Sequence, residues 1–244
     1  MIKHKAYFRL LKVYADIWSR RNCRVIMSGE ERIDTSRPRV YIVSHPTTWD
    51  LPLLVHISRR NFYIVVAEGP FAHPLVSWIF NSAGFYKLTK ENSTRVIEKT
   101  CSRVRDGNPL IYSLKGYGVD FGEDVRPRTG GVRIAHLAGA DIYPTHLMIE
   151  EGKRYFKYYK KSETESYPYT LFNDTLYYVT FLPPLRYEDY GKPEMTYEDY
   201  KGIAYSLEER FQASQKDIEE RMKADPEYYD GLKRKGGSPK QVIL

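Results

Sequence analysis

Residues 40–50 read Val-Tyr-Ile-Val-Ser-His-Pro-Thr-Thr-Trp-Asp. The run from Val40 to Ser44 is short, apolar and rich in β-branched residues, which predicts a buried strand, and a helix is expected from about Thr48 to Arg60. His45 therefore follows the end of a strand, and Asp50 lies at the start of a helix. In α/β folds, reactive side chains often occupy this kind of junction.

The alternation of short apolar runs and amphipathic stretches continues after this junction. Strands are expected at residues 40–44, 62–66, 85–88, 109–113, 142–148, 155–160 and 176–182, and helices at residues 48–60, 75–83, 94–105, 130–139 and 196–222. Such an order of elements predicts a mixed α/β fold, in which a central sheet has helices on both faces.

The chain is long enough for one large domain. It has 244 residues, of which 42% are hydrophobic, so it can bury a core, and no repeat or linker divides it. We expect an N-terminal helix over residues 1–23, a folded domain over 24–225 and a loose tail over 226–244. The two cysteines, Cys23 and Cys101, match neither a metal site nor a disulfide framework, which is typical of a reducing compartment.

Positive charge is concentrated near the N-terminus. Residues 1–25 carry seven basic side chains and one acidic one, and so hold +6 of the net charge of +7. Apolar residues recur there at helical spacing, with Tyr and Trp among them, which fits a basic amphipathic helix lying in the plane of an anionic membrane surface. The pattern fits equally a surface helix that packs one stripe on the core. Since no run of about 18 apolar residues occurs, we expect no membrane-spanning helix and only peripheral or monotopic contact with the cytoplasmic face of a membrane.

His45 and Asp50 together suit general-base chemistry. A carboxylate that accepts the N–H of an imidazole fixes its tautomer, and the other ring nitrogen is then able to take a proton from a substrate hydroxyl. The spacing also has a structural explanation, because Thr47 followed by Asp50 three residues later matches a helix capping box. The residues alone leave both interpretations open.

Read in order, the chain resembles the lysophospholipid acyltransferase family. The resemblance covers roughly residues 24–220 and depends on several blocks in the same order at suitable spacings. These blocks are Ser44-His45-Pro-Thr-Thr-Trp-Asp50, which falls on the family's His-x-x-x-x-Asp motif; Ala67-Glu-Gly-Pro-Phe71 with Pro74 and Trp78; Gly84-Phe-Tyr-Lys-Leu-Thr-Lys90; Thr129-Gly-Gly131 through Ala138-Gly139 with Ile142-Tyr-Pro144; and Val179-Thr-Phe-Leu-Pro-Pro184.

The resemblance implies a glycerolipid acyltransferase-like fold and an enzyme of phospholipid biosynthesis. Such an enzyme moves a fatty acyl group from acyl-CoA or acyl-carrier protein to the hydroxyl of a lyso-lipid, for example 1-acylglycerol-3-phosphate. The resemblance also implies that His45 is the general base and that Asp50 orients it. The expected partners are membrane lipids and the acyl donor. Neither a metal nor another cofactor is implied, nor is a serine or cysteine nucleophile.

One block departs from the family's pattern. Where the family has Glu-Gly-Thr-Arg, this chain has Lys115-Gly116-Tyr117-Gly118, so the acid and the arginine that help to place the acceptor headgroup are both replaced. Other cations near this block are able to face an anionic headgroup, although a lysine lacks the bidentate fork of an arginine. The substrate-binding set implied by the resemblance is Lys90, Lys115, Gly116 and Arg128.

Two other classes of function are consistent with parts of the sequence. A lipid-binding member of the family without turnover would keep the fold, and the altered block favours it. A nucleic-acid-binding protein would use the basic N-terminus and the clustered tyrosines. The nearly balanced charge of residues 26–244 argues against nucleic acid as a partner.

Overall fold

The structure is a computed structural model, which describes residues 2–47, 50–59, 61–67, 71, 74–89, 91–115, 125–149, 153–160, 166–173, 175–228 and 230. Within these ranges, seven strands form one mixed sheet: β1 (Cys23–Ser28), β2 (Arg39–Val43), β3 (Tyr63–Ala67), β4 (Phe85–Leu88), β5 (Leu110–Ser113), β6 (Asp141–Ile149) and β9 (Thr175–Phe181). They lie side by side in the order β1-β9-β6-β2-β5-β3-β4.

β2 occupies the middle of the sheet, between β6 and β5, and runs parallel to both. β3 continues the parallel part beside β5, and β4 follows it at the edge. Beyond β6 the direction changes, because β9 pairs with β6 antiparallel and β1 pairs with β9 in parallel. The carboxyl ends of β2, β5 and β6 therefore meet at one edge of the sheet, and β9 begins at that same edge.

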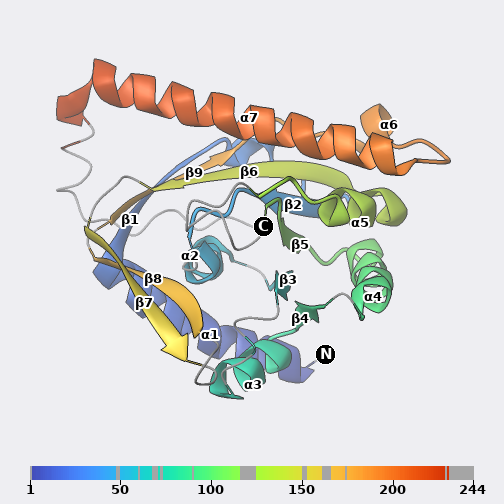
Figure 1. Cartoon of the computed structure of the whole chain (residues 1–244), viewed down its shortest axis with the longest axis horizontal. Coiled ribbons are helices and arrows are strands. Elements are labelled where there is room, and N and C mark those ends of the chain that lie inside the picture. Colours follow the sequence, from blue (N-terminus) through green and yellow to red (C-terminus); the bar gives the residue numbers. More distant parts are fainter. Residues whose placement is uncertain are drawn as a thin grey trace.

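Helices cover both faces of the sheet (Figure 1). One face carries α1 (Ile2–Asn22), α2 (Asp50–Ile57) and α3 (Pro74–Ser82), and the other carries α4 (Ser93–Arg105), α5 (Gly130–Ala138) and α7 (Tyr197–Ala224). The short helices η1 (Glu30–Arg32) and α6 (Tyr187–Tyr190) lie in connections. This arrangement confirms the predicted mixed α/β fold with helices on both faces.

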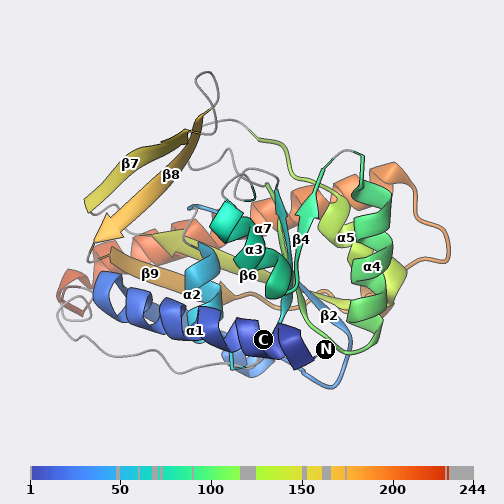
Figure 2. The ribbon, with the colours of Figure 1, turned by 90° about the horizontal axis from the view of Figure 1, so that it is seen from below.

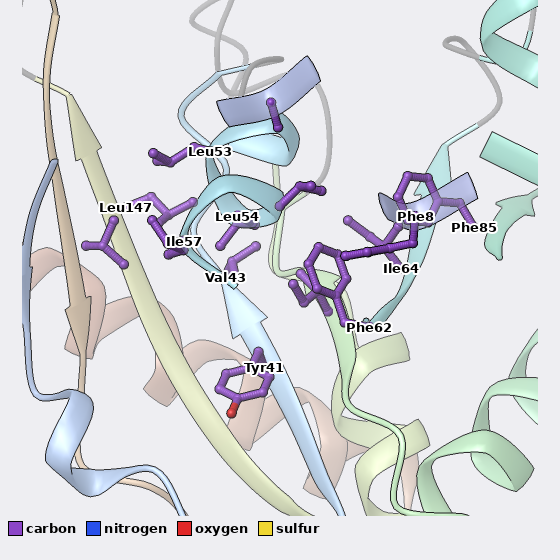
Figure 3. Packing of buried hydrophobic residues seen from close by; sticks show 14 of the residues in the cluster. Phe8, Tyr41, Val43, Leu53, Leu54, Ile57, Phe62, Ile64, Phe85 and Leu147 are labelled. Atoms are coloured by element: carbon purple, nitrogen blue, oxygen red, sulfur yellow. The ribbon is translucent and has the colours of Figure 1, made fainter. Parts of the chain in front are cut away.

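The sheet divides the core into two layers, and β2 contributes buried side chains to both. All five of its residues are buried, which explains why the strand reads as a continuous apolar run and not as an alternating one. Tyr41 and Val43 belong to the layer shared with α1 and α2 (Figure 3). In that layer Phe8 of α1 meets Phe62 edge to face, with 5.1 Å between the ring centroids. The strand that leads to His45 is thus held from both sides.

α1 packs an inner stripe on this core. Phe8, Ala15 and Ser19 are no more than 2% exposed, so this side of the helix packs on the core. A second, outer stripe of large apolar side chains is exposed on the same helix. It consists of Leu10, Val13, Tyr14 and Ile17.

α3 extends the exposed apolar surface of α1. Leu75 and Trp78 of α3 are exposed, and Trp78 meets Tyr7 of α1 edge to face at 5.2 Å between centroids. The α1–α3 patch is defined as Leu10, Val13, Tyr14, Ile17, Leu75 and Trp78. Among the helices that the structure describes, none is both long and apolar enough to pass through a bilayer.

A two-stranded hairpin, which lies between β6 and β9 in the chain, projects from the main sheet (Figure 2). It consists of β7 (Lys153–Lys160) and β8 (Ser166–Asn173), which pair antiparallel. The sequence predicted strands at residues 155–160 and 176–182, which correspond to β7 and β9, and no strand between them. That prediction was wrong for β8. The strand contains Pro168, which is tolerated because β8 is paired on one side only.

Candidate active site

The segment after β2 is anchored to the neighbouring strand β6. The Ser44 amide donates to the carbonyl oxygen of Thr145 at 3.2 Å. The Ser44 hydroxyl donates to the carbonyl oxygen of Leu147 at 3.0 Å and accepts from the Leu147 amide at 2.7 Å. Since Ser44 precedes His45 directly, these bonds fix the point at which the histidine leaves the sheet.

His45 and Asp50 form a hydrogen-bonded pair. Nδ1 of His45 lies 2.8 Å from Oδ2 of Asp50. The side chain of His45 is 23% exposed, whereas that of Asp50 is 2% exposed. A carboxylate facing Nδ1 places the ring hydrogen on that nitrogen, so Nε2 is the atom that is able to accept a proton. The pair therefore combines a partly exposed imidazole with a buried carboxylate.

Asp50 is held by several further donors. Its Oδ2 also accepts from the Thr47 amide at 3.1 Å, and its Oδ1 accepts from the Thr47 hydroxyl at 2.9 Å and the Tyr177 hydroxyl at 3.4 Å. Asp50 is the first residue of α2, where the positive end of the helix dipole favours a negative charge. These contacts compensate for the loss of water around the buried carboxylate. The bond from the Thr47 amide matches one half of the capping box, so the structural and the catalytic interpretation of Asp50 are compatible.

Tyr177 is a site residue that the sequence interpretation missed. It comes from β9, is 0% exposed, and its hydroxyl lies 2.8 Å from that of Thr47. Burial raises the pKa of Tyr177 well above its usual value, and the nearby Asp50 carboxylate raises it further, so the phenol stays neutral and remains a donor. The sequence offered no signal for this role, because Tyr177 reads as one more tyrosine in a strand.

Of the four residues expected to bind the headgroup, the structure describes Lys115 and Arg128. Lys90 and Gly116 lie outside the described residues. The register of β2 and β5 pairs Val43 with Ser113, so Lys115 follows β5 at the same edge at which His45 follows β2. Arg128 is exposed and joins this edge through its amide, which donates to the carbonyl oxygen of Leu114 at 2.8 Å.

Lys115 is directed away from the His45–Asp50 pair. Its ammonium group forms an ion pair with Glu208 of α7, on the opposite face of the sheet from α2. The sheet edge thus brings Lys115 and Arg128 near the level of His45, but the lysine side chain lies with the helix layer of α7.

The other described histidines in the folded core have structural partners. Both ring nitrogens of His136 are within hydrogen-bonding distance of partners, with the Tyr200 hydroxyl at 2.9 Å and the Lys192 carbonyl oxygen at 2.7 Å. His146 contacts the Ser214 hydroxyl at 3.0 Å. His136 is 9% exposed and His146 is 3% exposed. His45 is the more accessible imidazole and lies at the edge where parallel strands end.

Comparison with known proteins places these observations in a family. Residues 24–148, just over half of the chain, match the family model described as Acyltransferase. The chain belongs to this acyltransferase family. The matched range includes His45, Asp50, Lys115 and Arg128, whereas Tyr177 of this acyltransferase lies beyond it.

A solved structure with the same fold supports the architecture of this acyltransferase. It is the 1-acyl-sn-glycerophosphate (LPA) acyltransferase PlsC from Thermotoga maritima, with a TM-score of 0.60 and 14% sequence identity. The match covers 87% of this chain and 79% of the PlsC chain. No curated protein sequence matches the chain significantly.

Proposed function

We propose that this acyltransferase moves a fatty acyl group from an acyl thioester to the hydroxyl of a lyso-lipid at a membrane surface. The observation that carries the proposal is the pair His45–Asp50, in which a partly exposed imidazole is oriented by a buried carboxylate. 1-Acylglycerol-3-phosphate is the acceptor we propose, because the similar structure carries the name of an acyltransferase for that lipid.

The proposed reaction is a direct transfer. Nε2 of His45 accepts the proton of the acceptor hydroxyl while the oxygen attacks the thioester carbonyl carbon. The Asp50 carboxylate stabilises the imidazolium that forms. When the tetrahedral intermediate collapses, the carbon–sulfur bond breaks and the imidazolium returns its proton to the leaving thiolate. The products are the acylated lipid and free CoA or carrier-protein thiol, and His45 is neutral again.

For the acceptor headgroup we propose the set Lys90, Lys115, Gly116 and Arg128. Lys115 and Arg128 support this set, since both lie at the edge of the sheet where β5 ends. Lys115 already forms an ion pair with Glu208. A phosphate group that binds Lys115 would therefore have to displace the Glu208 carboxylate from the ammonium group.

The membrane side of the proposal rests on the α1–α3 patch. Exposed apolar residues of α1 lie beside exposed cations of the same helix, Arg9, Arg20 and Arg21, a composition that favours an anionic lipid surface. We propose peripheral binding to the cytoplasmic face, which agrees with the two free thiols Cys23 and Cys101.

Radiolabelled acyl transfer into lipid vesicles tests the function. Long-chain acyl-CoA and acyl-carrier protein serve as donors, and phosphorylated and neutral lyso-lipids as acceptors. We expect product from the native protein and a loss of about 100-fold or more in His45→Ala and Asp50→Asn. His136→Gln, which alters a buried imidazole in the other layer, should retain turnover. Equal product from native protein and His45→Ala would show that His45 is not the base.

The second candidate is a lipid-binding member of the family without turnover. Lys115 and Gly118 in place of the family's Glu and Arg favour it, as does the pairing of Lys115 with Glu208. A folded native protein whose Tm rises with lyso-lipid, but which forms no product with any donor, would establish this candidate.

A further inference from the structure

The contact between α1 and α2 contains a polar cluster. Lys12 and Asp16, one turn apart on α1, reach the last turn of α2. Lys12 Nζ donates to the carbonyl oxygens of Val55 at 3.3 Å and His56 at 2.9 Å. The last four carbonyls of a helix have no partner within it, so the lysine caps α2 and complements the negative end of its dipole.

Asp16 joins the same two helices through a second contact. Its Oδ1 lies 2.7 Å from Nδ1 of His56 and 3.4 Å from Nζ of Lys12. His56 is 2% exposed, and burial lowers the pKa of its imidazole against the opposing effect of Asp16. The neutral ring therefore donates its Nδ1 hydrogen to the carboxylate. Lys12, Asp16 and His56 are called the α1–α2 cluster.

α2 connects this cluster to the His45–Asp50 pair. Asp50 is the first residue of the helix and His56 the last but one, a separation of about 9 Å along the axis. A single short helix moves as one body, so the position of its last turn sets the position of its first. The core side chains between them are packed against β2 and hold the helix laterally (Figure 3).

We propose that Lys12 and Asp16 are positioning residues for acyl transfer: by holding the end of α2, they keep Asp50 at hydrogen-bonding distance from His45. The inference rests on the proposed function, since it concerns the same pair. It makes α1 a part of the support of the active site. The helix presents its outer apolar stripe to the outside, and Lys12 and Asp16 to α2.

Kinetics of Lys12 variants provide the first test. Lys12→Met keeps the aliphatic stem and removes the donor, and we expect kcat to fall about 10- to 100-fold with KM for donor and acceptor within about twofold. Lys12→Arg should restore most of kcat. Lys216→Met is the matched control, because it makes the same change at an exposed position of α7, on the opposite face of the sheet. Its kcat should stay native, with equal vesicle-bound fractions for both Met variants.

The hydrogen between His45 and Asp50 provides a second test that needs no turnover. Its downfield proton NMR signal, assigned through its loss in His45→Ala, should shift or broaden in Lys12→Met and Asp16→Asn. It should be unchanged in Lys12→Arg and Lys216→Met. If Lys12→Met does not fold, Asp16→Asn replaces it in both tests. Native signal and native kcat in a folded Lys12→Met or Asp16→Asn would overturn the inference. A shifted signal without product from any acceptor would support it and contradict the proposed function.

Discussion

The carboxylate of Asp50 collects hydrogen bonds from residues that are far apart in the sequence. His45 and Thr47 belong to the same turn, whereas Tyr177 arrives from a strand near the other end of the folded domain. A buried charge with one donor would rotate about its side-chain torsions, but several donors at different angles fix it. Asp50 is therefore oriented before any substrate binds.

Tyr177→Phe tests this orienting role at the residue scale. The change removes one hydroxyl that contacts both Thr47 and Asp50. We expect kcat to fall about tenfold at nearly unchanged KM, and stability in urea to fall by about 1–2 kcal/mol, the usual effect of losing a buried hydrogen bond. Tyr178→Phe is the matched control, since Tyr178 is buried on the opposite face of β9. Identical kcat values for the two variants would exclude a special role for Tyr177.

The candidate pair that the sequence alone reveals consists of residues close together in the chain. His45 and Asp50 are five residues apart, so a pattern reveals them, and their contact is confirmed by the structure. Tyr177 lies 127 residues from Asp50, and its role depends on how β9 pairs with β6. Only the register of that pairing brings the phenol to the turn, and no local pattern encodes a register between distant strands.

At the scale of helices and strands, predictions succeeded where a single period was strong. The expected helix at 196–222 is α7, which has a complete capping box at Thr196 and Asp199. β8 was missed because Pro168 interrupts its strand pattern. In α1, some apolar residues form a stripe that packs on the core and others form a stripe that is exposed. The sequence pattern alone did not distinguish the two stripes.

The contact of β6 with α7 predicts a loss of stability in acid. His146 of β6 is 3% exposed, and burial lowers its pKa to about 4. The ordinary value is about 6.5, so the unfolded chain takes up the proton first as the pH falls. The stabilisation is fully present above about pH 6.5 and is lost as the pH falls towards 4. The free energy of unfolding should decrease by about 3 kcal/mol over this range through His146 alone.

Urea unfolding at several pH values measures this effect. His146→Gln keeps a polar group near Ser214 but does not titrate, so its stability should depend less on pH than that of the native protein. Ser214→Ala keeps the imidazole and should retain the full loss. His56, whose pKa is also lowered by burial, adds to the loss in all three proteins. Equal pH dependence of His146→Gln and the native protein would contradict the assignment.

For the molecule as a whole, the exposed apolar side chains are distributed unevenly. Those of the α1–α3 patch lie together on two adjacent helices, and the patch is on the face opposite α7 (Figure 1). Leu137 of α5 is exposed on the other face, and exposed apolar residues outside such a patch are normal on a protein surface. If the protein binds a membrane as proposed, this patch and the neighbouring cations predict that α1 faces the lipid.

Leu10→Ser combined with Ile17→Ser tests this orientation. Both side chains are more than half exposed, so the fold should lose little stability. Partial burial of each in the lipid interface contributes about 1 kcal/mol, and binding to anionic vesicles should weaken about tenfold or more in a sedimentation assay. Leu137→Ser is the control and should bind like the native protein. Binding of the double variant at the native level would argue against the patch as the lipid-facing surface.

The pairing of β1 has a consequence for biosynthesis. β1 follows α1 directly and lies at the edge of the sheet, where its partner is β9. During synthesis, more than 140 further residues are added after β1 before its partner, Thr175–Phe181, leaves the ribosome. Pairing over so long a separation is slow, and an unpaired apolar strand is prone to aggregate meanwhile. We therefore expect the nascent N-terminal segment to need protection, for example by chaperones, long before His45, Asp50 and Tyr177 are brought together.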